Sequence, residues 1–541
     1  MRTLRRQVLY LTAVLSVLVL NGCGQKAKTE PNSIDLVPES KLGTRIGAVA
    51  TVAKPAPVAV QGYGVVGALP GTGAGNCPPA VRNYLRRYIM TQAPAGGIDI
   101  DALLNSKNTA VVLLQGVVPA AASDGEHFDV RVSLAPGSEA SSLYGGWLYK
   151  AELMPGGVGS GARALATVEG PVFVNTIGVS KPDMREGYVL GGGRTIGNYR
   201  GALTLRKADF LLASQIRNRL NERYGSGTAD ALAPTTVGLR IPPEFQRRKL
   251  RFIEMVGAMY VDQTPELNEA RINMYVQRLA VSNDKENSEI ALEAIGWECL
   301  GKLGTLLQAS DEEVRLRAAR CMLNLRDDRG FVVLRDMMLS PKSPRRLEAM
   351  DAIAISARRN DATAVIRRML RDSDSAVILA AYEHLRDLED LSVRQEIVGR
   401  SFYLEQVAQM DRKAIFVSRS GEPRIVLFGV PLTCGHDLFV ESPDGMVVIN
   451  SKPGQEYVSI MRRHPTRPGI IGPMETGFGV DEIVRTLGSE FSPSNRERAA
   501  SGLGVCYADV ATLVQQLAAK DAVEAEFWAG PLPKLGLIIK K

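Results

Sequence analysis

The sequence predicts a multidomain α+β protein in which small mixed α/β and β modules are interrupted by an all-α segment. Alternating apolar and polar residues, clearest at Phe128–Ser133, indicate strands in the first half. Between residues 285 and 400 the apolar positions take a helical period and charged residues multiply. After Phe402, short apolar runs separated by turn residues return. The 541 residues are 45% hydrophobic, which is enough to bury several cores.

Residues 1–22 have the features of a secretory signal peptide. Three arginines precede the apolar run Val8–Leu20, which is too short for a stable membrane span. The segment Leu20–Cys23 then resembles a bacterial lipobox, so we expect a lipid to be attached to Cys23. Plain secretion with cleavage near Gly22 is the alternative.

The residues that follow Cys23 indicate an outer-membrane lipoprotein with a tether. Gly24 stands where an inner-membrane retention signal usually places Asp, which favours anchoring to the outer membrane. Residues 23–58 are polar and then rich in Ala, Pro and Val, as expected for a linker. Removal of the leader lowers the number of basic residues from 65 to 62, against 58 acidic ones. That balance argues against a nucleic-acid partner.

Cysteine usage is sparse and predicts neither a disulfide scaffold nor a metal site. The cysteines after Cys23 are Cys77, Cys299, Cys321, Cys434 and Cys506. One bridge is possible in an oxidising periplasm. Cys299 and Cys321 lie in helical apolar patterns, which favours small core residues. Cys434 and His436 lack the second pair of ligands that a structural zinc site needs, so we interpret them as structural.

A glycine-rich run at Gly62–Gly73 contains a formal G-x-G-x-x-G and therefore invites a dinucleotide hypothesis. The residues after Gly67 break a helix rather than open one, and no acidic residue lies between Gly67 and Asp99. No Lys-Ser or Lys-Thr pair follows, which excludes a P-loop. We predict no cofactor, and a role in assembly or backbone geometry instead. The residues of this motif are Gly62, Tyr63, Gly64, Gly67, Gly71, Thr72 and Gly73.

The run resembles the Gly-Tyr-Gly…Gly-Thr-Gly segment near the mature N-terminus of flagellar basal-body P-ring proteins. Two later blocks follow in that family's order. Phe128–Ser133 resembles its Ile-Asp-Val-x-Val-Ser, and Ala140–Leu148 resembles its Ala-x-Ser-Leu-x-Gly-Gly-x-Leu. The paired glycines of the second block, Gly145 and Gly146, join the predicted motif because they let two backbones come close.

A small α/β module is predicted next. Leu203–Phe210 resembles the family's strand ending in Pro-Asp-Phe, and Asp209 is a suitable N-cap for the helix that follows. That helix should end at Gly225. Two further strands are expected at Ala229–Ala231 and Thr236–Pro242. A strand, a helix and a strand in this order suggest one α/β unit.

The helical segment carries an internal repeat of 31 residues, because Leu316, Leu347 and Ile378 occur in register. Three or four short HEAT-like helical pairs would give this spacing, and such arrays usually bind partners. Ordinary helices with accidental spacing are the alternative. The loops expected to cap the first helix of each pair are Ser310-Asp311, Ser343-Pro344 and Ser373-Asp374.

The C-terminal part resembles the P-ring family again. Leu503–Asp509, a helix with a Val510 and Leu513 stripe, and the strand-like Ala522–Phe527 match its last block. The two P-ring-like stretches should meet in space, with the repeats projecting as a separate lobe. The predicted organisation is a signal peptide at 1–22, a lipidated N-terminus and linker at 23–58, a P-ring-like α/β region at 59–280, HEAT-like repeats at 281–404 and a P-ring-like C-terminal region at 405–541.

The resemblance implies a structural subunit of the flagellar P ring, a periplasmic ring that surrounds the rod as a bushing for motility. It implies three kinds of partner: further copies of this chain, the flagellar rod and outer-membrane L-ring proteins. A non-flagellar outer-membrane lipoprotein that binds partners through the repeats is the alternative. A periplasmic enzyme using carboxylates such as Asp99 and Asp101 is a third hypothesis, but we predict no catalytic residue because no catalytic motif is present.

Overall fold

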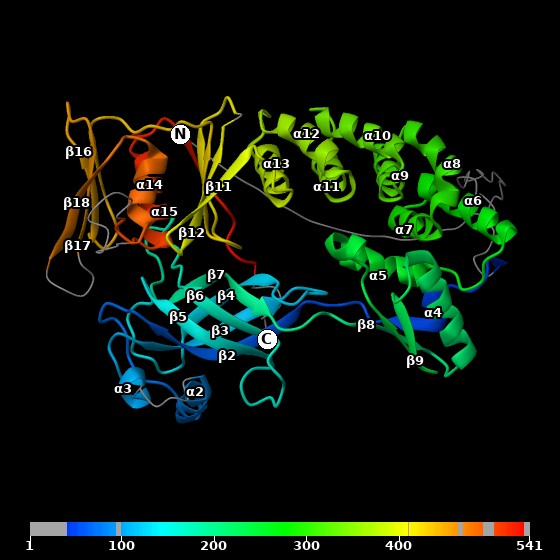
Figure 1. The fold of residues 1–541 in the computed structure, drawn as a ribbon, viewed down its shortest axis with the longest axis horizontal. Helices are drawn as coiled ribbons and strands as arrows, with labels where there is room; N and C mark the ends of the chain where they lie inside the picture. The colour runs from blue at the N-terminus through cyan, green and yellow to red at the C-terminus, as the bar shows by residue number, and fades with distance from the viewer. Residues whose placement is uncertain (1–40, 93–98, 409, 464–468, 491–501, 535–541) are drawn as a thin grey trace, which may run out of the picture.

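The computed structural model describes residues 41–92, 99–408, 410–463, 469–490 and 502–534. Figure 1 shows four parts: a β-barrel, an α/β module beside it, an array of helices above the module, and a β-rich C-terminal region above the barrel. Helices and strands are both abundant, and a helical array stands beside a β-barrel, which confirms the predicted α+β class. In the described part of the chain, no helix combines the length and the hydropathy needed to cross a membrane.

The barrel closes through six antiparallel strands in the order β2-β3-β4-β7-β6-β5. They are β2 (Val58–Gly67), β3 (Ala110–Val118), β4 (His127–Leu134), β5 (Trp147–Pro155), β6 (Ala166–Pro171) and β7 (Glu186–Thr195). Alternate side chains such as Val60, Val112 and Val130 fill the interior, as the two-residue period of a strand requires. Helices α2 (Pro79–Gln92) and α3 (Ile100–Leu104) cover the outer face of β2 and β3.

The α/β module contains a four-stranded antiparallel sheet in the order β1-β8-β10-β9. Its elements are α1 (Ile46–Val49), β1 (Ala50–Val52), β8 (Gly201–Leu205), α4 (Phe210–Tyr224), β9 (Ala229–Ala233), β10 (Thr236–Leu239), η2 (Pro243–Arg248) and α5 (Lys249–Ala258). The predicted caps of α4 are confirmed. The Asp209 carboxylate accepts the backbone N–H of Leu212 at 3.0 Å, and the helix ends at Gly225 with φ of 98°.

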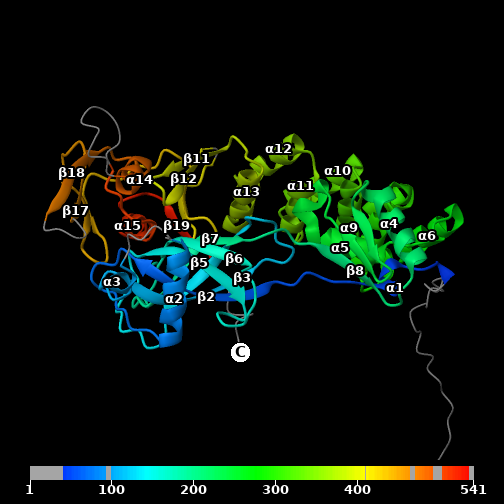
Figure 2. The same ribbon diagram turned by 60° about the horizontal axis from the view of Figure 1, so that its bottom comes forward.

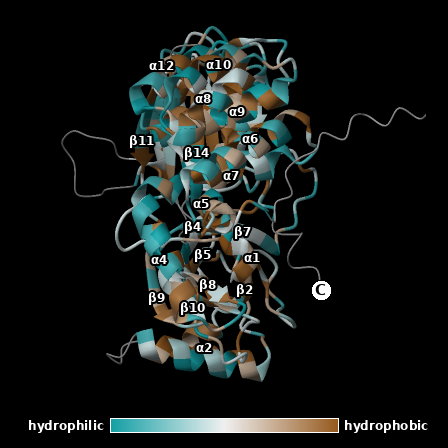
Figure 3. Cartoon of the chain, turned by 90° about the vertical axis from the view of Figure 1, so that its right-hand side faces the viewer, coloured by the Kyte–Doolittle hydropathy of each residue, from teal (hydrophilic) through white to brown (hydrophobic). Residues whose placement is uncertain are grey.

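The helical array begins at Pro265, ahead of residue 281, where the sequence places the boundary. Its elements are α6 (Pro265–Val281), α7 (Lys285–Ile295), η3 (Trp297–Cys299), α8 (Leu300–Leu303), η4 (Gly304–Gln308), α9 (Glu312–Asn324), α10 (Asp328–Leu339), α11 (Arg346–Ser356), α12 (Arg359–Met369) and α13 (Ser375–Asp387). Hydrophobic and hydrophilic segments alternate along these helices in Figure 3. Their apolar faces form one continuous core.

Two of the three predicted helix caps are confirmed. The carboxylates of Asp311 and Asp374 accept backbone N–H groups in the first turns of α9 and α13. The third was wrong, because α11 starts after Arg345 without a side-chain cap. The 31-residue spacing also predicts a buried residue in this helix that the structure leaves exposed. Leu347 is 41% exposed, since it lies in the first turn, before the buried stretch of α11 that begins at Ala349.

The C-terminal region has two sheets, in the orders β11-β12-β14-β13-β19 and β15-β16-β17-β18. The strands are β11 (Val393–Val398), β12 (Phe402–Val407), β13 (Ala414–Val417), β14 (Arg424–Phe428), β15 (Leu438–Glu441), β16 (Val447–Ser451), β17 (Val458–Arg463), β18 (Ile470–Thr476) and β19 (Glu526–Ala529). Helices α14 (Val480–Gly488) and α15 (Tyr507–Ala519) complete it, and the predicted stripe of α15 is buried. The last strand begins at Glu526 rather than Ala522, because Ala525 turns back to bond Val523.

The four parts are interlocked, which corrects one expectation. The barrel and the C-terminal region share a hydrophobic core that includes Phe173 and Leu190 from the barrel side, so the two predicted stretches do meet. The helices, however, do not project as a separate lobe. They run from the α/β module to the C-terminal region, with α6 and β12 at opposite ends of the array (Figures 1 and 2). The stacked helices hold the two ends of the array apart.

Candidate functional site at the glycine-rich seam and the module junction

The first three predicted glycines lie within β2 and are packed inside the chain. A Cβ atom added to Gly62 would lie 2.2 Å from the backbone oxygen of Glu152, and one added to Gly67 would lie 2.6 Å from the Tyr149 hydroxyl. Gly64 faces side chains of the barrel interior. One strand contains all three glycines, so the strand–turn–helix geometry of a dinucleotide site is absent here.

The Gly71–Gly73 loop is held by backbone contacts from two directions. Gly71 has φ of +78°, a left-handed conformation that favours glycine. A Cβ atom on Gly73 would lie 2.1 Å from the carbonyl oxygen of Thr109. Between them, the Thr72 hydroxyl donates to the carbonyl oxygen of Ser142 at 3.0 Å. The loop is therefore fixed against the segment that carries the second predicted motif.

The second motif, Gly145 and Gly146, packs against the same end of β2. Gly145 has φ of +72°, and a Cβ atom on Gly146 would lie 2.4 Å from the Val66 side chain. Tyr63 points outward from β2 and packs beneath α2. The structure therefore brings together most of the residues that the sequence singles out, around one end of β2. We call this set the glycine seam; its residues are Gly62, Gly64, Gly67, Gly71, Thr72, Gly73, Gly145 and Gly146.

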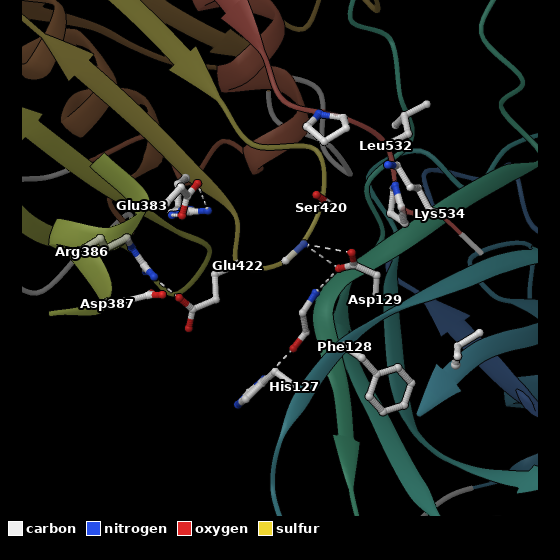
Figure 4. Close-up of a pocket in the computed structure, with 16 residues that line it drawn as sticks. His127, Phe128, Asp129, Glu383, Arg386, Asp387, Ser420, Glu422, Leu532 and Lys534 are labelled. Atoms are coloured by element: carbon white, nitrogen blue, oxygen red, sulfur yellow. Dashed lines mark hydrogen bonds and ion pairs between the residues drawn. The ribbon is translucent and has the colours of Figure 1, made fainter. Parts of the chain in front are cut away.

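A second site joins the barrel to the C-terminal region and is centred on Asp129 of β4. Its carboxylate accepts the backbone N–H of Gly191 at 2.7 Å and that of Gly421 at 2.9 and 3.0 Å (Figure 4). Both glycines have positive φ, and a Cβ atom on Gly191 would lie 3.2 Å from the Gly421 backbone. Burial raises the pKa of Asp129, while the two N–H donors oppose that shift.

A cavity of about 600 Å³ lies at this junction, between β4, α13 and the loop at 420–422. Ion pairs cross it: Arg386 donates to Glu422 at 2.6 Å, and Arg424 makes a bidentate contact with Glu383 at 2.9 Å (Figure 4). These pairs tie α13 of the array to the C-terminal sheet. The charged side chains are directed at one another, so their contacts join the two modules that border the cavity.

A partly buried polar cluster forms a third link between the barrel and the C-terminal region. The Tyr144 hydroxyl and the Cys506 thiol both donate to the carboxylate of Asp509 in α15, the thiol at 3.1 Å. Burial raises the pKa of all three groups. Beside this cluster, Thr176 and Thr512 share a hydrogen bond of 2.7 Å.

The contacts at these sites attach one module of the protein to another. Asp129 and Asp509 are engaged by donors from the neighbouring module, which leaves neither free to act as a base. Within the described ranges, no group of three His, Cys, Asp or Glu side chains could hold a metal ion. Cys434 is buried, which raises its pKa to about 12. The predicted lipid-attachment residue Cys23 lies outside the described residues.

Sequence reasoning missed the roles of Asp129, Tyr144 and Asp509, although all three lie in motifs that it quoted. Asp129 looked like the outward residue of an alternating strand, and Asp509 like a helix-opening acid. Their partners are 292 and 365 residues away in the chain. Only the tertiary structure could reveal those contacts, because local periodicity carries no information about them.

The fold and its junctions describe a protein assembled from interlocked modules. Residues 45–278, which contain the barrel and the α/β module, match the family model described as Flagellar P-ring protein. Over these residues, which make up less than half of the chain, the sequence is similar to flagellar P-ring proteins.

Individual relatives agree with this assignment. A flagellar P-ring protein 1 of Bradyrhizobium diazoefficiens is 28% identical over 222 residues, covering 37% of this chain and 56% of the relative. The flagellar P-ring protein of Hydrogenovibrio crunogenus is 30% identical over 247 residues, covering 42% of this chain and 63% of the relative. The chain thus spans little more than half the length of these relatives. The match ends before most of the helical array, so the C-terminal resemblance stays a prediction.

Proposed function

We propose that this protein is a structural subunit of the flagellar basal-body P ring. The observation that carries the proposal is the family match at residues 45–278, because it covers two complete modules with their cores rather than one short motif. The protein would act without catalysis, as one member of a periplasmic ring around the rod. That ring would serve as a bushing that lets the rod turn.

A closed ring of identical subunits needs a heterologous contact, in which one face of a subunit meets a different face of the next. The interlocked arrangement supports this role, since a bearing subunit must hold its shape under load. The proposed partners are further copies of the chain, the rod and the outer-membrane L ring. We further propose that the glycine seam serves assembly by fixing the backbone of the loops around β2.

Deletion of the gene in the source bacterium tests the proposal. We expect loss of swimming and basal bodies that lack the ring between the rod and the outer membrane, seen by electron microscopy of purified basal bodies. Expression of the full chain from a plasmid should restore both. Normal swimming and complete basal bodies after deletion would reject the proposal and favour the lipoprotein scaffold.

A further inference from the structure

One stretch of the α/β module is exposed along its whole length. It runs from the end of β8 into the first turn of α4, at residues 206–211, and we call it the tip loop. Its sequence is Arg-Lys-Ala-Asp-Phe-Leu. Phe210 is 68% exposed and Leu211 is 70% exposed. Single exposed apolar residues are common on protein surfaces, but two adjacent large ones within a fully exposed run indicate a surface that binds a partner.

The fold holds the tip loop in this exposed position. The backbone N–H of Arg206 donates to the carbonyl oxygen of Val49 at 2.9 Å, and that of Asp209 donates to Pro234 at 2.9 Å. The Asp209 carboxylate caps α4 by accepting the N–H of Leu212. Because these bonds fix the backbone on both sides, the apolar side chains at the start of α4 stay directed into the solvent.

The charge of the tip loop is mainly positive. Among the described residues, neither Arg206 nor Lys207 has an ion-pair partner, and the carboxylate of Asp209 is occupied by the helix cap. Residues 200–219 contain five basic side chains and one acidic one. Unpaired basic groups beside exposed apolar ones fit the anionic surface of a lipid bilayer. The core of a protein–protein interface, in contrast, is poor in lysine.

The N-terminal segment enters the fold beside the tip loop. Strand β1 pairs with β8, and Ala50 lies opposite Leu205, the residue before the tip loop. The module lies at the end of the molecule away from the C-terminal sheets (Figures 1 and 2). Cys23, the predicted lipid-attachment residue, precedes Lys41 by 18 positions, so the chain between them spans at most about 65 Å. A lipid on Cys23 would keep the tip loop within reach of the same bilayer.

We propose that the tip loop contacts the periplasmic leaflet of the outer membrane. Phe210 and Leu211 enter the boundary between headgroups and acyl chains, and Arg206 and Lys207 lie against anionic headgroups. The predicted anchor makes this contact intramolecular, so a small patch is sufficient. A tether alone leaves the α/β module free to turn, whereas a second attachment directs this end of the protein towards the membrane. The contact goes beyond ring formation and does not depend on it.

Flotation of vesicles tests the proposal with the mature chain from Gly24 onward. That chain lacks the predicted leader and Cys23 but keeps every described residue. We expect it to float with vesicles of phosphatidylethanolamine and phosphatidylglycerol, and to bind less in about 0.5 M salt, which screens the basic groups. Arg206→Ser/Lys207→Ser should bind these vesicles no better than the unchanged chain binds phosphatidylcholine vesicles. A mature chain that does not float with the anionic vesicles would overturn the proposal.

A second pair of substitutions tests the apolar part of the contact. Phe210→Ser/Leu211→Ser should lower the partition onto anionic vesicles by about tenfold, because two large side chains no longer leave water. The matched control is Leu391→Ser/Ile397→Ser, at side chains that are 96% and 63% exposed beside and within β11, and it should bind like the unchanged chain. All four side chains are exposed, so the melting temperatures should agree. Equal binding by the two variants would reject the role of the tip loop.

Fluorescence distinguishes insertion into lipid from contact between copies of the chain. Lipids brominated on their acyl chains should quench Phe210→Trp more than the unchanged chain, whereas Leu391→Trp should gain no quenching. Absence of added quenching, together with lipid-free oligomers that Phe210→Ser/Leu211→Ser abolishes, would assign the tip loop to a contact between copies and overturn the proposal. These measurements require neither a lipid on Cys23 nor an assembled ring. Failure of the lipobox prediction or of the proposed function would therefore be detected separately.

Discussion

Asp509 is a carboxylate enclosed between two modules. It accepts hydrogen bonds from Tyr144 and Cys506, and burial raises its pKa. The folded-state pKa therefore lies above the unfolded value, so the native state binds a proton more readily than the unfolded chain. The contribution of Asp509 to the free energy of unfolding consequently rises as the pH falls from above the folded pKa to below the unfolded one.

The variant Asp509→Asn should remove this pH dependence. Relative to the variant, we expect the wild type to gain stability as the pH is lowered from 7 towards about 4, near the ordinary pKa of an aspartate. Urea unfolding of both proteins across this range measures the difference. Asp387→Asn, at an exposed carboxylate beside the junction cavity, should follow the wild type. A wild type that loses stability relative to Asp509→Asn on acidification would contradict the assignment.

The two glycines of the Gly71–Gly73 loop should respond differently to substitution. Gly73→Ala forces a Cβ atom against the Thr109 carbonyl oxygen, and we expect a loss of about 1–3 kcal/mol in the free energy of unfolding. In Gly71→Ala the new Cβ atom meets no neighbouring atom. The free energy of unfolding should therefore fall only by the cost of the left-handed backbone, about 1 kcal/mol.

Chemical denaturation and the oligomeric state should be measured together for these variants and for Gly71→Val/Gly73→Val. Loss of ring formation by a variant that remains folded would support the proposed role of the loop in assembly. Gly73→Ala with wild-type stability would show that the loop is not packed as described.

At the scale of elements, helix α7 connects the family-matched module to the array through a buried charge network. Glu289 is fully buried and accepts contacts from Arg251 of α5 and from Arg317 and Arg320 of α9. Burial acts to raise the pKa of Glu289, but the three arginines hold it below its ordinary value. Glu293 of the same helix also pairs with Arg251, and Glu313 also pairs with Arg317, so Glu289 shares the balancing of these cations with two other carboxylates.

Replacement of Glu289 by Gln should destabilise the protein strongly, by about 3–5 kcal/mol, because among the described residues it removes the charge partner of Arg320 and one of the two partners of Arg251 and of Arg317. The urea midpoint measures the loss. Glu286→Gln, in the exposed first turn of the same helix, is the matched control and should change stability by less than about 0.5 kcal/mol. Similar small effects in both variants would show that the network does not hold α7 in place.

At the scale of the whole molecule, every part is fixed to at least one other by buried groups. Asp129 and Asp509 link the barrel to the C-terminal region, Arg386 links that region to α13, and Glu289 links the array to the α/β module. The helices thus span the top of the molecule between two of its parts (Figure 2). Such an arrangement transmits load across modules instead of leaving one of them free to swing.

The predicted lipid anchor is tested on the whole protein in cells. We expect Cys23→Ser to abolish incorporation of labelled fatty acid and to shift the protein towards the soluble periplasmic fraction. Labelling is the cleaner measurement, because attachment to a ring could retain the variant in the envelope. Unchanged labelling of Cys23→Ser would remove the lipobox prediction, and Cys77→Ser should label like the wild type.

The sequence by itself indicated much of the local structure and the resemblance to P-ring proteins. Periodicity is a local property, so it located strand β4 of the barrel, the helix capped by Asp209, the array and the buried stripe of α15. The glycine motif was recognisable because a backbone that must approach another one closely tolerates few other residues. The same local reasoning failed at Leu347, where burial depends on which turn of the helix meets its neighbours.

Only the tertiary structure decided which distant residues meet. The contacts of Asp129 with Gly421 and of Tyr144 with Asp509 join segments whose spacing in the chain follows no local period. It also decided that the helices run between two modules instead of projecting from them. The physical reason is that packing of whole modules fixes these contacts, and the free energy of that packing is distributed over surfaces that no short stretch of sequence contains.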